Sequence, residues 1–178
     1  EQCRARPGED LVSALIAVRD AGDALTDDEL LSTCGLLLLA GHETSVNLIA
    51  SGALALLRAP GQLAALRADP GRADRVVDEV LRCEPPFQLV TRLAVEDLEI
   101  GGARVPRGHR VALLLAAANR DPARFADPDR FDPDRPDGRH LGFGAGVHYC
   151  LGAPLARLEG SIALARLAER AEGLELLA

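Results

Sequence analysis

Several residue types are scarce or missing in this sequence. It has no methionine and no tryptophan, and only 3% of its 178 residues are aromatic. Because translation starts with methionine, we expect these residues to be part of a longer primary product. Lysine is also absent, so all 20 basic residues are arginine, which we interpret as the coding bias of a GC-rich, bacterial genome.

Cysteine and positive charge are also limited. Four cysteines, at positions 3, 34, 83 and 150, are too few and too scattered for a disulfide framework, and no signal peptide opens the sequence. We therefore expect a location in the reducing cytoplasm. Acidic residues outnumber basic residues by 27 to 20, and the basic residues form no cluster, so nucleic-acid binding is not expected.

The rest of the composition is that of a globular protein. Hydrophobic residues make up 48% of the chain and charged residues 26%, which excludes a disordered or collagen-like chain. A chain of this length can bury about 70% of the surface that its unfolded form exposes. We expect residues 1–178 to form a single but incomplete domain.

The longest apolar run, Leu30–Leu57, carries one formal charge, at Glu43. A helix of this length would reach about 42 Å, which is enough to cross a bilayer. Polar residues gather at its middle, however, where one acidic group would cost about 2.5 to 3.5 kcal/mol in a membrane. Thr26 to Glu29 also has the pattern of an N-cap followed by an acidic first turn. We therefore predict a helix in a protein core and no membrane span.

The apolar spacing predicts further helices on both sides of this run. They cover Asp10–Ala21 with an end near Gly22, Pro60–Leu66, a segment from Pro70 to about Cys83, Val111–Ala118, and a segment from about Cys150 to Gly173. In the last helix, apolar residues share roughly one face; they are Leu151, Leu155, Leu158, Ile162 and Leu167.

A different pattern separates these helices. Alternating apolar residues between Leu98 and Val111, interrupted by Gly101-Gly102 and by Pro106-Arg107-Gly108, predict a small hairpin with two turns. Residues 119–140 form a long polar connection, which is rare in a compact domain unless it is functional or packed by its own contacts. The predicted fold class is mainly α with a minor, small β-sheet.

The segment FGAGVHYCLG, residues 143–152, has the most distinctive chemistry. Gly144 and Gly146 precede Cys150, and glycine allows turns with positive φ and lets a flat ligand approach the backbone. A cysteine at the start of a helix is favoured as a thiolate, because unpaired N–H groups and the helix dipole stabilise negative charge. The spacing fits neither a dinucleotide-binding turn nor a zinc site. The segment alone leaves open a small buried thiol or a protease nucleophile.

FGAGVHYCLG resembles the heme-binding loop of the cytochromes P-450, F-x-x-G-x-x-x-C-x-G. The resemblance implies heme b (iron protoporphyrin IX) as the cofactor, with Cys150 as the proximal ligand of the iron. It further implies that Phe143 packs near the sulfur and that His148 holds a heme propionate. Gly144 and Gly152 belong to the same implied cofactor-binding loop.

The segment AGHETS, residues 40–45, lies in the middle of the apolar run. Taken alone, it fits a helix kink with ordinary polar packing, in which the Thr44 hydroxyl bonds the carbonyl four residues earlier and lets water enter. It resembles the distal helix motif A-G-x-[DE]-T of the same family. The resemblance implies that Glu43 and Thr44 organise proton delivery to dioxygen and that Ala40 and Gly41 face heme and substrate.

Glu79 and Arg82 stand at i and i+3, and as a surface pair they would contribute only about 0.2 to 0.5 kcal/mol. They resemble the E-x-x-R motif of the family, and Asp129-Arg130-Phe131 resembles its downstream arginine. The resemblance implies a buried triad of Glu79, Arg82 and Arg130 that anchors the connection leading to Cys150. Arg92 resembles a second propionate ligand; the alternative is a solvated arginine at a strand edge.

These segments occur in the order typical of the family, and the resemblance spans nearly all 178 residues. It implies the C-terminal, heme-bearing part of the cytochrome P-450 fold. The implied enzyme is a soluble, bacterial-type monooxygenase, which inserts one oxygen atom of O2 into an apolar organic substrate with electrons from a ferredoxin-type donor. Because less than half of a usual member is covered, we expect these residues alone to be inactive.

Two other functional classes compete with the monooxygenase. One is a truncated, non-catalytic heme-binding remnant. The other is a heme-thiolate isomerase, dehydratase or peroxygenase. Glu43 and Thr44 argue against the second class, since oxygen activation uses that proton relay and peroxide use needs it less.

Overall fold

The computed structural model describes residues 2–20, 25–136, 138–170 and 173–176. The chain divides into two compact units, residues 1–43 and 44–178, with the boundary inside a helix. The single incomplete domain stays a prediction.

The first unit contains helix α1 (Gln2–Ala5), helix α2 (Leu11–Asp20) and the beginning of helix α3 (Asp27–Arg58). The short helix α1 was not predicted. Helix α2 confirms the predicted helix, whose expected end at Ala21 and Gly22 lies outside the described residues.

Capping residues set the starts of α2 and α3. The Asp10 carboxylate accepts the Ser13 backbone N–H at 2.9 Å at the start of α2. At the start of α3, the Glu29 N–H donates to the Thr26 hydroxyl at 3.2 Å, and the Thr26 N–H donates to the Glu29 carboxylate at 2.8 Å. This reciprocal capping box confirms the N-cap predicted at Thr26.

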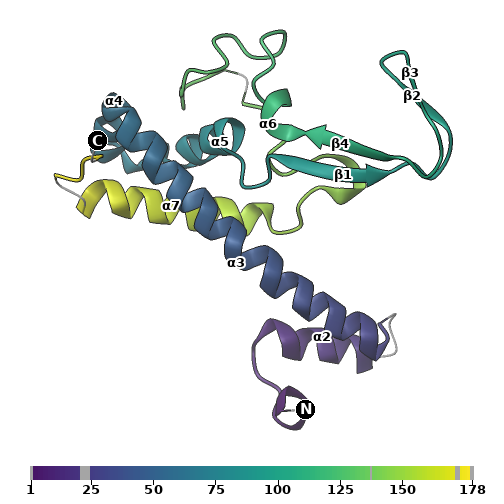
Figure 1. Cartoon of the computed structure of the whole chain (residues 1–178). Coiled ribbons are helices and arrows are strands. Elements are labelled where there is room, and N and C mark those ends of the chain that lie inside the picture. Colours follow the sequence, from purple (N-terminus) through teal and green to yellow (C-terminus); the bar gives the residue numbers. More distant parts are fainter. Residues whose placement is uncertain (1, 21–24, 137, 171–172, 177–178) are drawn as a thin grey trace. The chain divides into compact units, whose positions relative to one another are not determined.

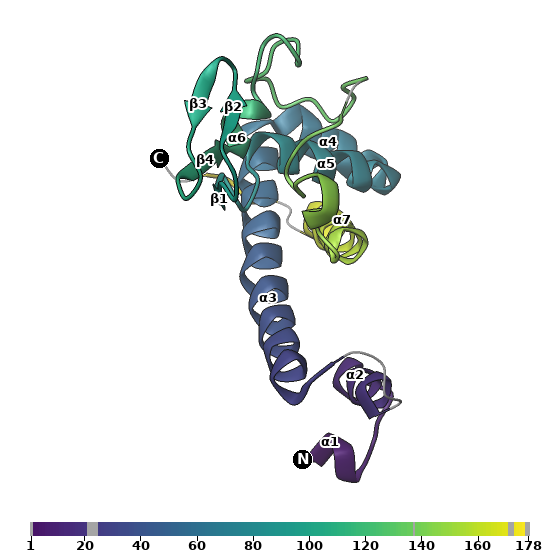
Figure 2. The same cartoon turned by 90° about the vertical axis from the view of Figure 1, so that its right-hand side faces the viewer.

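The second unit is built mainly from helices. It contains the rest of α3, helix α4 (Pro60–Ala68), the 3-10 helix η1 (Pro70–Arg72), helix α5 (Ala73–Cys83) and helix α7 (Ala153–Arg170). These elements confirm the helices predicted after Pro60, after Pro70 and after Cys150. Figures 1 and 2 show α5 and α7 lying side by side.

The core of this unit lies where α3, α4, α5 and α7 meet, and its buried members are Leu48, Leu56, Leu66, Ala73, Val76, Val77, Val80, Leu81, Leu164 and Ala168. Two glycines allow the helices to approach closely. A Cβ atom at Gly52 would lie 2.7 Å from Leu164 Cδ1, and one at Gly160 would lie 3.1 Å from Val77 Cγ2. A side chain at Gly52 would overlap the end of the Leu164 side chain, which would have to shift for the two helices to stay this close.

Helix α7 buries small residues together with Leu164, and it exposes Leu155, Leu158 and Ile162. Its buried positions include Gly160, Ser161 and Leu164. The apolar face grouped from the sequence is largely exposed; Leu155 is 59%, Leu158 is 57% and Ile162 is 56% exposed. Apolar spacing therefore located this helix but did not identify the face that packs against α3 and α5.

Two short antiparallel sheets complete this unit (Figure 2). Strand β1 (Leu89–Leu93) pairs with β4 (Arg110–Leu114), and β2 (Leu98–Ile100) pairs with β3 (Ala103–Val105). The β2–β3 turn consists of Gly101-Gly102 with φ of 57° and 81°, as a tight two-residue hairpin requires. The first predicted turn is therefore confirmed.

The helix predicted over Val111–Ala118 is wrong in its first half. Val111 to Leu114 belongs to β4, and only helix α6 (Leu115–Ala118) is helical. A short run of apolar residues fits a strand and a helix equally well. The hydrogen-bond ladder to β1, which lies earlier in the sequence, decides for the strand.

The connection between α6 and the last helix is held by contacts with the end of α5 and by contacts within itself. Arg120 donates to the Cys83 carbonyl at 2.9 Å, and Arg135 donates to the carbonyls of Ala126 and Arg130. These charge-assisted bonds satisfy backbone groups that no regular element pairs.

Among the described residues, no single helix has the length and apolarity needed to cross a membrane. Helices α3 and α4 pass that test only as a pair, and they are bent by 108° at the break between them.

Candidate functional site

The cysteine loop, defined as residues 140–152, is closed by its own backbone hydrogen bonds. The Cys150 N–H donates to the Phe143 carbonyl at 3.0 Å, and the Gly144 N–H donates to the Leu141 carbonyl at 2.8 Å. Gly144 and Gly146 have φ of 73° and 68°, in the left-handed region that favours glycine. Both glycines are therefore needed for the path that the loop takes to Cys150.

Cys150 lies just before the first turn of α7, and its carbonyl accepts the Ala153 N–H at 3.3 Å. The residue is exposed, and so are its apolar neighbours Val147 and Leu151, at 97% and 89%. The interpretation of Cys150 as a small buried thiol is therefore wrong. Within the described ranges, no group of three or more His, Cys, Asp or Glu side chains could hold a metal ion.

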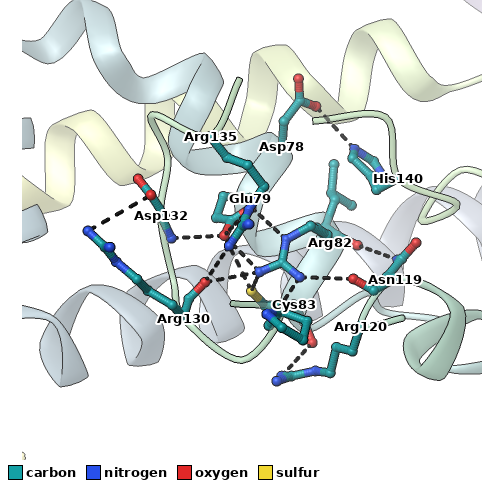
Figure 3. A network of polar contacts seen from close by, with 12 residues as sticks. Asp78, Glu79, Arg82, Cys83, Asn119, Arg120, Arg130, Asp132, Arg135 and His140 are labelled. Carbon is teal, nitrogen blue, oxygen red and sulfur yellow. Dashed lines mark hydrogen bonds and ion pairs between the residues drawn. The ribbon is translucent and has the colours of Figure 1, made fainter. Parts of the chain in front are cut away.

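A buried ion pair on α5 anchors the connection that leads to this loop (Figure 3). Arg82 is 0% exposed, and its Nε and Nη2 donate to the two carboxylate oxygens of Glu79, each at 2.8 Å. Its Nη1 also donates to the carbonyls of Asn119 at 2.9 Å and Pro128 at 2.8 Å. One guanidinium thus holds two points of the connection against α5.

The predicted triad is wrong in its third member. The Arg130 side chain is 67% exposed, and its guanidinium lies 3.9 Å from the Asp132 carboxylate (Figure 3). Arg135 takes the expected place, with a side chain that is 9% exposed and an Nε 3.6 Å from Glu79 Oε1. At Arg130 it is the backbone carbonyl that points inward and accepts hydrogen bonds from Arg82 and Arg135.

Cys83 joins the same network and was not singled out from the sequence. Its sulfur accepts from Arg82 Nη2 at 2.9 Å, and its thiol donates to Glu79 Oε1 at 3.7 Å. Burial, reinforced by the Glu79 charge, raises the pKa of the Cys83 thiol from 9.0 to about 11. Cys83 therefore stays protonated and acts as a hydrogen-bond donor.

Asn119 ties the cysteine loop to α5 and was also missed. It is 1% exposed, its Oδ1 accepts the Leu141 N–H at 2.7 Å, and its Nδ2 donates to the Leu81 carbonyl at 3.4 Å. Its position as the first polar residue after the apolar run of α6 was the only available signal. That signal fits any helix end.

A second polar cluster joins α5, the cysteine loop and α7. Asp78 Oδ1 accepts from Arg157 Nε at 2.8 Å and lies 3.4 Å from His140 Nε2. The Arg157 guanidinium carbon lies 4.7 Å from the centre of the Phe143 ring. Burial acts to raise the pKa of Asp78, but the bonds from His140 and Arg157 outweigh it and hold this pKa below its usual range.

The two predicted propionate ligands are both exposed. Arg92 lies on β1 and donates to the neighbouring Thr91 carbonyl at 3.0 Å. His148 ends the 3-10 helix η2 (Gly146–His148) inside the cysteine loop. Phe143, the residue predicted to pack near the sulfur, is half-buried, and a Cβ at Gly152 would lie 3.9 Å from Cys150 Sγ.

The residues of AGHETS all lie within α3, which is α-helical at every position from Asp27 to Arg58. The opening expected at Thr44 therefore does not interrupt the helix. In the first unit, Glu43 is exposed, Ala40 is exposed, and a Cβ at Gly41 would meet no atom within 4 Å. Thr44 is half-buried in the second unit.

A family model described as Cytochrome P450 matches residues 1–171. The chain belongs to this family. The predicted family and the predicted fold class are therefore confirmed.

Known relatives are bacterial members of the family. The chain is 51% identical to cytochrome P450 monooxygenase PikC of Streptomyces venezuelae, over 97% of this chain and 42% of PikC. It is 49% identical to 6-deoxyerythronolide B hydroxylase of Saccharopolyspora erythraea, over 99% and 44% of the two chains. The ligand-free structure of Mycobacterium smegmatis CYP164A2 matches with a TM-score of 0.95 and 59% identity, over 99% and 45%. The chain thus spans less than half the length of each.

Proposed function

We propose that this chain carries the heme-thiolate part of a monooxygenase that inserts one oxygen atom of O2 into an apolar organic substrate. The observation that carries the proposal is the exposed Cys150 thiol at the end of a loop closed by hydrogen bonds. The names of two relatives, cytochrome P450 monooxygenase PikC and 6-deoxyerythronolide B hydroxylase, support this reaction class.

The residues of the cysteine loop fit heme b. A thiolate is a soft, anionic ligand for iron, and exposed Val147 and Leu151 beside Cys150 offer apolar contact to a flat ring. Exposed Arg92 and His148 supply cationic or donor groups suited to propionates. When bound, heme b supplies an iron centre at which dioxygen is reduced and its O–O bond cleaved.

The protein's own contribution begins with the sulfur of Cys150. The hydrogen bond from its N–H to the Phe143 carbonyl fixes the backbone from which that sulfur projects. In α3, we assign proton movement to Glu43 and Thr44 from the AGHET motif. The exposed Glu43 carboxylate exchanges protons with water, and the Thr44 hydroxyl donates a hydrogen bond during the reaction.

The partners and location belong to the same proposal. We propose a ferredoxin-type protein as the electron donor. The Glu43-Thr44 relay favours oxygen activation over peroxide use. We propose the cytoplasm as the location, in accord with four cysteines that are all unpaired.

Titration of the purified chain with hemin tests the proposal. The wild-type chain should bind one hemin per chain with a thiolate-type absorption spectrum, and Cys150→Ser should lose that spectrum. Cys34→Ser is the matched control and should behave as wild type, because Cys34 lies outside the cysteine loop. Retention of the thiolate-type spectrum in Cys150→Ser would contradict the assignment of the ligand.

A further inference from the structure

One carboxylate on α5 contacts both the first residue of the cysteine loop and the helix that follows the loop. Asp78 Oδ1 accepts from Arg157 Nε at 2.8 Å and lies 3.4 Å from His140 Nε2. His140 is the first residue of the loop, and Arg157 follows the loop on α7. Figure 3 shows Asp78 and His140 pointing toward each other. The same oxygen atom therefore links the start of the loop to the helix that follows it.

The hydrogen bonds of His140 define which ring nitrogen carries the hydrogen. The Gly142 N–H donates to His140 Nδ1 at 3.0 Å, so Nδ1 presents its lone pair. In the neutral ring the hydrogen then lies on Nε2, which faces Asp78. The ring is 3% exposed, so water has little access to exchange these partners.

Arg157 contacts the loop in two further ways. Its guanidinium carbon lies 4.7 Å from the centre of the Phe143 ring, and its Nη1 lies 3.4 Å from the Tyr149 hydroxyl. Phe143 in turn accepts the Cys150 N–H through its carbonyl at 3.0 Å. The contacts thus run without a gap from Asp78 through Arg157 and Phe143 to the backbone of Cys150.

The loop also lies tightly against α5 at its start. A Cβ at Gly142 would lie 2.7 Å from the Leu81 carbonyl oxygen and 2.9 Å from His140 Nδ1. The adjoining Leu141 N–H is held by Asn119. Because the backbone is fixed on this side, the clamp acts on the part of the loop that ends at Cys150.

We infer that Asp78, His140 and Arg157 form a clamp that positions Cys150 for its ligand. They are positioning residues, because they act on Cys150 through Phe143 and the loop backbone. The identity of the ligand rests on the proposed function, whereas the ordering of the loop does not. An arginine is needed at 157, because one flat guanidinium must bond Asp78 while its face covers Phe143.

Backbone hydrogen exchange in the heme-free chain tests the clamp directly. In Arg157→Gln, the amides of Gly144 and Cys150 should exchange about tenfold faster or more, because a charge-assisted bond and a cation–π contact are lost. The amides of Val77 and Val80 in the core helix α5 should keep their wild-type rates. Arg166→Gln is the matched control. Arg166 lies on the same helix, and within the described residues its guanidinium pairs with the surface residue Glu169.

Two results would overturn the clamp. One is an unchanged exchange rate at Cys150 in Arg157→Gln, and the other is an equal acceleration in α5, which would reveal general destabilisation instead of positioning. If Arg157→Gln does not fold, Arg157→Lys decides by the same criteria. The lysine keeps the charge but cannot both cover Phe143 and bond Asp78, so faster loop exchange is again expected.

The hemin-loaded chain separates this inference from the proposed function. Arg157→Gln should shift the thiolate-type absorption band, and Arg166→Gln should leave it in place. If Cys150→Ser keeps the wild-type heme spectrum while Arg157→Gln still frees the loop, the proposed ligand is wrong and the clamp stands. If Cys150→Ser loses the spectrum while Arg157→Gln changes neither exchange nor absorption, the clamp is wrong and the ligand stands.

Discussion

Replacement of Arg82 by alanine should cost this chain more stability than any surface arginine would. The side chain is 0% exposed and occupies both carboxylate oxygens of Glu79 together with three backbone carbonyls, those of Asn119, Pro128 and Arg130. Removal of one partner of a buried ion pair costs about 3 to 5 kcal/mol, because the other charge stays buried. At about 4 kcal/mol, the unfolded fraction rises about a thousandfold.

The measurement is urea unfolding of the chain, followed by far-ultraviolet circular dichroism. The double variant Glu79→Gln/Arg82→Ala should be less destabilised than the sum of the two single variants, because the orphaned charge is removed with its partner. Arg104→Ala is the control. Arg104 and Asp97 are joined at 2.8 Å, but their side chains are 78% and 55% exposed, so the unfolding midpoint should barely move.

A loss below about 1 kcal/mol in Arg82→Ala would refute this reasoning, since it would mean that the pair is no stronger than a solvated one. Additive effects of the two single variants would refute it as well, because they would show no coupling between Arg82 and Glu79.

Three further predictions follow from the structure. Gly142→Ala should destabilise the chain by about 1 to 3 kcal/mol because its Cβ would meet the Leu81 carbonyl at 2.7 Å. Gly138→Ala should keep the wild-type stability, because a Cβ at Gly138 would meet no atom within 4 Å. Equal urea midpoints for the two variants would contradict the close approach of Gly142 to Leu81. Because the pKa of Cys83 is raised from 9.0 to about 11 by folding, the unfolded chain loses its proton first, and stability should fall by about 2 to 3 kcal/mol between those pH values. Cys83→Ala should abolish that fall, and urea unfolding at about pH 8 and about pH 11 checks it. Thr44→Ala should leave hemin uptake unchanged and, in the reduced, heme-loaded full-length protein that contains these residues, divert electrons to peroxide; unchanged coupling to product there would exclude the relay.

Local sequence signals predicted the helices well. Thr26 and Glu29 cap α3 through bonds between residues three apart, so their pattern is complete within one turn. Strand β4 was missed because its partner β1 lies elsewhere in the sequence, and the apolar run itself is ambiguous. Leucine spacing likewise identified α7, but the buried face of that helix is set by small residues such as Gly160.

The site residues show the same division. The glycines and the cysteine of the loop were predictable, because the segment 143–152 is continuous. The choice of Arg135 over Arg130 depends on the path of an irregular connection, which residue spacing does not define. Asp78 and Arg157 are 79 residues apart, so their contact exists only in the folded chain.

The most direct test of the account is the absorption spectrum of the reduced, heme-loaded protein with carbon monoxide. We predict a thiolate-type Soret band in the wild type and in Cys34→Ser, and its loss in Cys150→Ser. The same band in Cys150→Ser, or its absence from heme-loaded wild type, would contradict the claim that the Cys150 sulfur binds the heme iron.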